Sequence, residues 1–241
     1  MNVSCAIDWS FDLPAHLSGR LLKRPNRFLA LVETGGKVLE AHVHDPGRLP
    51  QILFPGNTVL LRRAFGPRRR TSWDLIAGQA AGFWVLVHSG YHRPLIDSLL
   101  KEHGRRLFPG LVKVSPEPSL NHGRLDYLLL FEDGLKLYVE TKGCTLSEGQ
   151  KALFPDAPTQ RGRRHLESLI SLVQEGSRSL IWFLVFRPET TCFAPAREID
   201  PKFTETLERA LSLGVELKIT KFFYDGKKIR LREDLPLCDK I

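Results

Sequence analysis

Residues 124–142 have the sequence RLDYLLLFEDGLKLYVETK, in which two apolar segments flank the tripeptide Glu132-Asp133-Gly134. A three-residue hairpin loop typically places its glycine last, in the left-handed backbone conformation. This loop would pair the two residues that border it, Phe131 and Leu135. The segment therefore predicts a β-hairpin, and its apolar flanks indicate that other elements cover it.

The predicted register brings acidic side chains together. Asp126 would face Glu140 directly, and directly opposed residues have Cβ atoms about 4.5–5.5 Å apart. Lys142 lies two residues beyond Glu140 and so points to the same face of the strand. Two facing like charges are destabilising unless a cation lies between them. A two-residue loop would instead put the two carboxylates on opposite faces.

These residue types suit metal-assisted hydrolysis. Mg²⁺ prefers oxygen ligands and usually binds one or two carboxylates while it keeps several waters. The metal activates a bound water, and a nearby lysine can orient or deprotonate that water or stabilise developing charge. Asp126, Glu140 and Lys142 therefore predict a phosphodiester-cleaving centre that uses Mg²⁺ or Mn²⁺. Glu117, on the approach to Asp126, is a further candidate metal ligand. The alternative is an ordinary solvated charge pair on a strand.

A basic segment, residues 161–165 (RGRRH), lies at the start of a helix predicted over residues 162–175. A helix N-terminus with guanidinium groups beside it suits a phosphate. Arg161, Arg164 and His165 are therefore candidate nucleic-acid-binding residues. For His165, a hydrogen-bonded structural role is the alternative.

The rest of the C-terminal sequence predicts an α/β domain with a mixed sheet. A helix is expected over residues 95–103, and another begins after Asp200, which precedes a proline suited to the first helical position. The continuous apolar run of residues 180–186 is typical of a buried central strand. Residues 215–220 predict a further strand.

The N-terminal sequence predicts a small β-barrel. Five short strands are expected over residues 28–33, 37–43, 58–63, 71–77 and 83–88. This count and size favour an oligonucleotide-binding (OB) barrel. The sequence therefore predicts two domains: an OB-fold nucleic-acid-binding domain over residues 1–88 and an α/β domain of the nuclease type over residues 89–241.

The charge favours a polyanionic partner. The formal net charge is +8, and residues 1–88 hold 11 Lys and Arg against 6 Asp and Glu. Five arginines fall within the nine residues 62–70, close in sequence to aromatic residues, as in single-strand binders. The alternative is a solvated basic loop. The candidate nucleic-acid-binding residues of this domain are Arg24, Arg27, Arg62, Arg63, Arg68, Arg69 and Arg70.

The cysteines and the N-terminal residues indicate the cellular compartment of the protein. Cys5, Cys144, Cys192 and Cys238 are not spaced as a zinc knuckle or a redox pair, so free thiols in a reducing compartment are expected. The first residues lack the pattern of a signal peptide, and no stretch is apolar enough to cross a bilayer. We expect a cytoplasmic protein without membrane contact.

Several segments together resemble the sugar fermentation stimulation protein A family. They are residues 24–28 (RPNRF), 44–49 (HDPGRL), 123–127 (GRLDY), 139–146 (VETKGCTL) and 154–166 (FPDAPTQRGRRHL). The resemblance implies an N-terminal OB barrel, a C-terminal domain of the PD-(D/E)xK nuclease superfamily, DNA binding and a genetic link to sugar utilisation. It also implies that Asp126, Glu140 and Lys142 form the metal-and-water centre, with the Thr141 carbonyl as a further metal ligand.

The resemblance leaves some points open. Leu125 replaces the proline that often precedes the aspartate, and the first acid of the motif is either Glu117 or Glu102. A metal-dependent nuclease acting on DNA or RNA is the first functional hypothesis. A DNA-binding regulator of sugar (maltose) metabolism genes with a catalytically silent nuclease fold is the second, and an oligosaccharide-binding barrel the third. Strandedness, exo or endo cleavage and oligomeric state stay open, a homodimer being one option.

Overall fold

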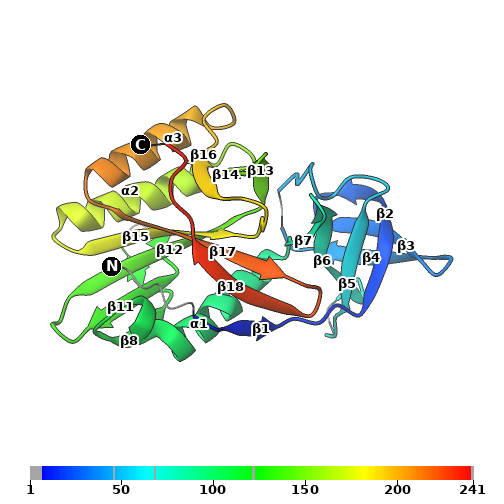
Figure 1. The fold of residues 1–241 in the computed structure, drawn as a ribbon, viewed down its shortest axis with the longest axis horizontal. Coiled ribbons are helices and arrows are strands. Elements are labelled where there is room, and N and C mark those ends of the chain that lie inside the picture. The colour runs from blue at the N-terminus through cyan, green and yellow to red at the C-terminus, as the bar shows by residue number, and fades with distance from the viewer. Residues whose placement is uncertain (1–6, 46, 68, 121–122, 240–241) are drawn as a thin grey trace.

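The N-terminal part of the chain forms a closed five-stranded barrel (Figure 1). The computed structural model describes residues 7–45, 47–67, 69–120 and 123–239. The strands of the barrel follow the order β4-β3-β2-β5-β6, and a parallel pairing of β4 with β6 closes it. They are β2 (Leu17–Asn26), β3 (Leu29–Thr34), β4 (Lys37–Val43), β5 (Thr58–Arg63) and β6 (Trp73–Ala80).

The predicted number of five barrel strands is confirmed, but two assignments were wrong: the barrel includes β2 and does not include β7. The prediction omitted β2, which pairs with both β3 and β5. Its sequence, LSGRLLKRPN, contains a glycine, a proline and five polar or charged residues, and only Leu21 is fully buried. The fifth predicted strand, β7 (Phe83–Leu86), pairs with β6 but reaches the sheet of the C-terminal part instead of closing the barrel.

The C-terminal part is built on a mixed sheet, as predicted. The sheet continues from β7 in the order β17-β15-β12-β11-β8. Its middle strands β12, β15 and β17 run parallel, whereas β11 and β8 are antiparallel to their neighbours. The strands are β8 (Leu111–Pro116), β11 (Tyr127–Phe131), β12 (Lys136–Cys144), β15 (Arg178–Val185) and β17 (Glu216–Tyr224).

Helices cover both faces of this sheet (Figure 1). Helix α1 (His92–Leu107), preceded by the short η1 (Ser89–Tyr91), packs on one face, and α2 (Gln160–Gln174) and α3 (Pro201–Ser212) lie together on the other. Seven of the eight residues of β15 are buried, because the strand is covered on both sides. The apolar core accordingly forms two clusters, and the one on the α1 face is continuous with the interior of the barrel.

Short strands that the sequence did not predict complete the fold. Strands β1 (Ser10–Asp12) and β18 (Lys228–Asp234) pair with each other, so the N-terminal segment runs along the C-terminal sheet. A second sheet contains β13 (Leu146–Glu148), β14 (Lys151–Phe154) and β16 (Cys192–Pro195). A third pairs β9 (Ser119–Leu120) with β10 (Gly123–Arg124). Among the described residues, no helix has the length and apolar character needed to span a bilayer.

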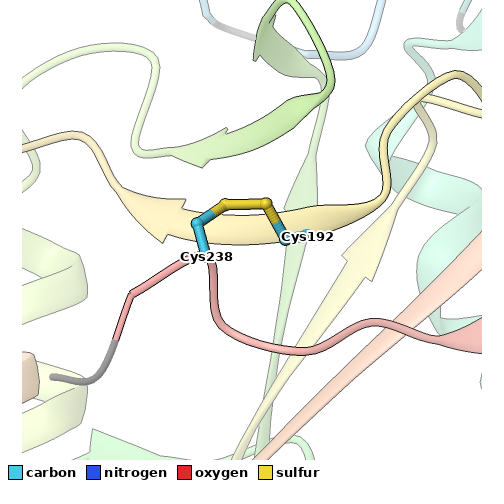
Figure 2. Close-up of a disulfide and its surroundings, with 2 residues drawn as sticks. All are labelled: Cys192 and Cys238. Atoms are coloured by element: carbon cyan, nitrogen blue, oxygen red, sulfur yellow. A yellow bond between two sulfur atoms is a disulfide. The ribbon is translucent and has the colours of Figure 1, made fainter.

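A disulfide bond corrects the prediction of free thiols. Cys192 in β16 is bonded to Cys238 near the C-terminus, with the two Cα atoms 4.9 Å apart (Figure 2). The pair is 46 residues apart in sequence, and only the fold brings it together. Cys144 is a free, buried thiol, and Cys5 lies outside the described residues.

Candidate metal centre

The hairpin of β11 and β12 has the predicted register. Tyr127 pairs with Val139 and Leu128 with Tyr138. The loop closes as expected: the Phe131 amide donates to the Leu135 carbonyl at 3.0 Å, and Gly134 has a φ of 82°. Because this left-handed conformation is costly for other residues, the glycine fixes the three-residue loop and with it the register.

Asp126 lies one residue before β11 and is held in place by Thr141. One carboxylate oxygen, Oδ2, accepts hydrogen bonds from the Thr141 amide at 2.7 Å and from its hydroxyl at 2.6 Å. Burial and then the charge of Glu140 raise the pKa of Asp126, which the two hydrogen bonds oppose. Glu140 contributes to this shift because its negative charge disfavours a second negative charge on Asp126.

Glu140 lies in the middle of β12 and is 2% exposed. Its Oε1 atom contacts both the ammonium group of Lys142 and Nδ1 of His165. Burial disfavours the charge of Glu140, but the hydrogen bond from His165 and the charge of Lys142 outweigh it and leave its pKa below the ordinary value. Its other oxygen, Oε2, is buried without a hydrogen-bond partner among the described residues.

The start of α2 supplies the basic side of the site. Thr159 caps this helix by accepting a hydrogen bond from the Gly162 amide at 3.0 Å. Nε of Arg161 donates to Nε2 of His165 at 3.3 Å, while Nζ of Lys142 lies 3.2 Å from Nδ1 of the same ring. His165 therefore links the helix to Glu140. Because Nε2 accepts from Arg161, Nδ1 carries the proton and donates it to Glu140, and the Lys142 ammonium lies beside Nδ1 without a hydrogen bond to that atom. Arg164 is exposed one residue away.

Neither candidate for the first acid joins this cluster in the structure. The Glu117 amide donates to the Asp126 carbonyl at 2.9 Å, but its side chain forms ion pairs with Arg93 and Arg124. Glu102 lies on α1 and accepts a hydrogen bond from Ser98 at 2.7 Å.

The residues present fit a divalent cation. An unpartnered buried carboxylate oxygen on Glu140 is costly unless a cation or water meets it. The Oδ1 atom of Asp126 is a second donor, since both bonds from Thr141 go to Oδ2. Hard cations such as Mg²⁺ prefer such oxygen ligands.

The candidate arginines of the barrel fall into two groups. Arg24 and Arg27 line a cleft of about 580 Å³ with Arg48, which the sequence did not single out. Arg24 donates to the carbonyls of Arg27, Gly47 and Arg48, which fixes its guanidinium group. The cleft is also lined by Ala157, three residues before α2, so it borders the C-terminal part.

The second group lies toward the opposite end of β2, because Leu17 pairs with Leu61 in antiparallel β5. Two of these side chains already have hydrogen-bond partners: Arg62 donates to the Pro14 carbonyl, and Arg69 donates to Asp74. The Arg63 guanidinium lies 5.6 Å from the ring centroid of Trp73. Arg70 is exposed, and Arg68 lies outside the described residues.

Two family models together match most of the chain. The model described as the SfsA N-terminal OB domain matches residues 22–87, and the model described as the sugar fermentation stimulation protein RE domain matches residues 90–228. The N-terminal barrel is therefore an OB fold, as predicted.

Individual relatives match over nearly their full lengths. A protein of Methanococcoides burtonii named sugar fermentation stimulation protein homolog is 39% identical over 237 residues, 96% of each chain. One of the same name from Thermotoga neapolitana is 42% identical and covers 95% of this chain and 99% of its own. A solved structure described as Pyrococcus furiosus SfsA in complex with Ca²⁺ matches with a TM-score of 0.86 at 28% identity, over 96% of this chain and 100% of that one.

Proposed function

The chain belongs to the sugar fermentation stimulation protein A family, and on that basis we propose that it binds nucleic acid and hydrolyses its phosphodiester bonds with Mg²⁺ or Mn²⁺. Asp126 and Glu140 would hold the metal, and Lys142 would act beside it. The observation that carries the proposal is the buried, unpartnered Oε2 of Glu140, two residues from a lysine and electrostatically coupled to a second carboxylate. The nucleic-acid-binding part of the proposal is supported by the OB barrel and its basic surface.

A bound divalent cation supplies an activated water and offsets charge on the phosphoryl group. The description of the Pyrococcus furiosus relative names a Ca²⁺ complex, and Ca²⁺ shares the preference of Mg²⁺ for oxygen ligands. The Thr141 carbonyl, and Glu117 or Glu102, are proposed as further ligands. Glu117 would have to leave its ion pair with Arg93 to serve.

The chain's own residues would orient the reactants. Thr141 fixes the rotamer of Asp126, and His165 fixes that of Glu140. When the substrate arrives, Lys142 can exchange its contact with Glu140 for the attacking water or a phosphoryl oxygen, which is a short side-chain movement. Arg161 and Arg164 at the start of α2 would bind the phosphate, aided by the helix N-terminus. Arg24, Arg27 and Arg48 in the cleft, and Arg62, Arg63, Arg68, Arg69 and Arg70 on the barrel, would bind further along the strand.

The test is cleavage of labelled single- and double-stranded DNA and RNA with Mg²⁺ or Mn²⁺. Asp126→Asn, Glu140→Gln and Lys142→Met should each abolish cleavage while leaving binding near the wild-type level. Glu148→Gln and Lys136→Met are the matched controls, because both side chains are exposed, the first in β13 and the second at the start of β12. Cleavage that persists in the Glu140→Gln and Lys142→Met proteins would refute the assignment.

A second candidate is a DNA-binding regulator whose nuclease fold is silent. It is favoured by the contacts of Glu140 Oε1, which already meets Lys142 and His165. This candidate predicts sequence-preferring binding that needs no metal and no cleavage of any substrate. A binding selection run with and without Mn²⁺ separates the two candidates.

A further inference from the structure

A second group of ligand-type side chains lies between the barrel and the segment that follows β7, and takes no part in the proposed cleavage. His44 follows β4, Asp74 lies in β6 and His88 lies two residues beyond β7. One ligand atom from each of the three lies within 4.8 Å of the other two. The parallel pairing that closes the barrel, which sets His42 opposite Asp74, brings the end of β4 to this place.

Ring nitrogens of this cluster lack hydrogen-bond partners, although His88 is buried and His44 is partly buried. Both ring nitrogens of His88, which is 5% exposed, have no hydrogen-bond partner in the described part of the chain, and neither has Nε2 of His44. Nε2 of His44 lies 3.5 Å from Oδ1 of Asp74, and Nε2 of His88 lies 3.8 Å from Oδ2. These separations are too long for hydrogen bonds of ordinary length. Buried polar atoms without partners indicate that something else satisfies them.

The spacing suits a shared metal ion. Zinc–nitrogen bonds are about 2.0–2.1 Å long, so two ligands of a tetrahedral site lie roughly 3.3–3.5 Å apart. His44 already lies at this separation from Asp74, His88 lies slightly farther away, and the two rings stack with their centroids 3.7 Å apart. Gly90 leaves the room that the rings need, since a Cβ atom there would lie 2.9 Å from Cε1 of His88.

We propose that His44, Asp74 and His88 bind a divalent transition metal ion such as Zn²⁺. Two imidazoles with one carboxylate favour Zn²⁺, Co²⁺ or Ni²⁺ over Mg²⁺ and Ca²⁺, which prefer all-oxygen sites. The site differs from the Glu140 centre in its ligand types, and it lies beside the barrel, whereas Glu140 lies in β12 of the C-terminal sheet. The side chain of His44 is 31% exposed, so a fourth coordination position can open to solvent on that side.

Arg69 competes with the metal ion for the Asp74 carboxylate. Its guanidinium group donates to Oδ1 of Asp74 and leaves Oδ2, on the His88 side, for the metal. A cation at the site repels Arg69, so binding should strengthen when the guanidinium is removed. Replacing Arg69 should therefore strengthen metal binding, whereas replacing a ligand should weaken it.

The experiment is a Co²⁺ and Zn²⁺ titration of the untagged, metal-stripped protein carrying Glu140→Gln, which disables the other centre. Co²⁺ should give one equivalent of visible d–d absorption, displaced by Zn²⁺ but not by excess Mg²⁺. His44→Gln and His88→Gln should each weaken Zn²⁺ binding by at least about tenfold, since each removes one of three ligands. Arg69→Gln should tighten it.

His103→Gln, on α1, is the matched control and should leave binding unchanged. If His88→Gln fails to fold, the partly exposed His44 still provides the test. The proposal is overturned if no Co²⁺ absorption develops in the Glu140→Gln protein, or if the absorption is unchanged by His44→Gln. Cleavage activity is not part of this readout, so failure here leaves the proposed nuclease function standing.

Discussion

Glu140 Oε1 accepts a hydrogen bond from Nδ1 of His165, which ties the middle of β12 to the second turn of α2. Partners of this kind orient metal-binding carboxylates, and their loss typically costs about 10–100-fold in metal affinity or activity. We therefore expect His165→Gln to lower cleavage by this factor and to raise the Mn²⁺ concentration needed for half-maximal activity. The measurement is the Mn²⁺ dependence of the cleavage rate, with Ser168→Ala on the same helix as the control. An unchanged Mn²⁺ dependence would show that His165 does not position Glu140.

The arginine cleft gives a prediction about salt. Each phosphate that the protein neutralises adds about 0.7–0.9 to the slope of log affinity against log salt concentration, depending on strandedness. Replacing the exposed Arg27 and Arg48 by glutamine should weaken binding to all sequences alike. The slope should fall by about 0.7–0.9 for each phosphate that the variant no longer neutralises.

Fluorescence anisotropy over a range of salt concentrations measures this slope. Arg178→Gln serves as the control, because Arg178 pairs with Glu216 at the start of β15 and does not line the cleft. If the double variant keeps the wild-type slope, nucleic acid does not bind in the cleft.

The hairpin register could be predicted because its determinants are local. Three loop residues and one left-handed glycine fix the pairing of Tyr127 with Val139, and nothing distant is required. The helix that begins after Asp200 is local in the same way: the carboxylate accepts a hydrogen bond from the Phe203 amide at 3.0 Å, and a proline follows.

Features that depend on contacts between distant parts of the chain could not be predicted from the sequence. Strand β2 alternates in burial but changes phase after Leu21, where its pairing with β3 shifts register, and this shift depends on the neighbouring strands. The Cys192–Cys238 bond and the cluster of His44 with His88 each join residues more than 40 positions apart. The contact between Glu140 and His165 likewise follows from packing of α2 on the sheet, so the sequence could suggest His165 only through the basic start of its helix.

The disulfide should contribute measurably to stability. Cys192 and Cys238 lie 46 positions apart in sequence, and closing a loop of this size in the unfolded state is worth about 4 kcal/mol in the chain-entropy model. Because native-state effects usually reduce this figure, the double variant Cys192→Ser/Cys238→Ser should lose about 2–4 kcal/mol of unfolding free energy. Urea unfolding with and without reductant measures the loss. Reductant should destabilise the wild type and have no effect on the double variant, and equal stability of all samples would contradict the expectation.

Asp200 gives a prediction with a defined pH dependence. Burial disfavours its charge, but hydrogen bonds from the Thr159 and Phe203 amides and the charge of Arg163 outweigh it, so the pKa of Asp200 lies below its ordinary value. A lowered folded-state pKa contributes stability that is fully present above the unfolded value of about 3.9 and is lost as the pH falls through the folded value.

The matched variant is Asp200→Asn, which keeps an oxygen to cap α3 but removes the charge. Asp200→Ala removes the cap as well and should cost about 1–2 kcal/mol from that loss alone, in addition to the ion pair with Arg163. Urea unfolding should show the wild type more stable than Asp200→Asn near neutral pH, with the difference shrinking as the pH falls below about 3.9. The difference between Asp200→Asn and Asp200→Ala should instead stay nearly constant with pH, because the asparagine cap does not titrate. A wild-type advantage that grows on acidification would mean that the carboxylate is not stabilised in its charged form.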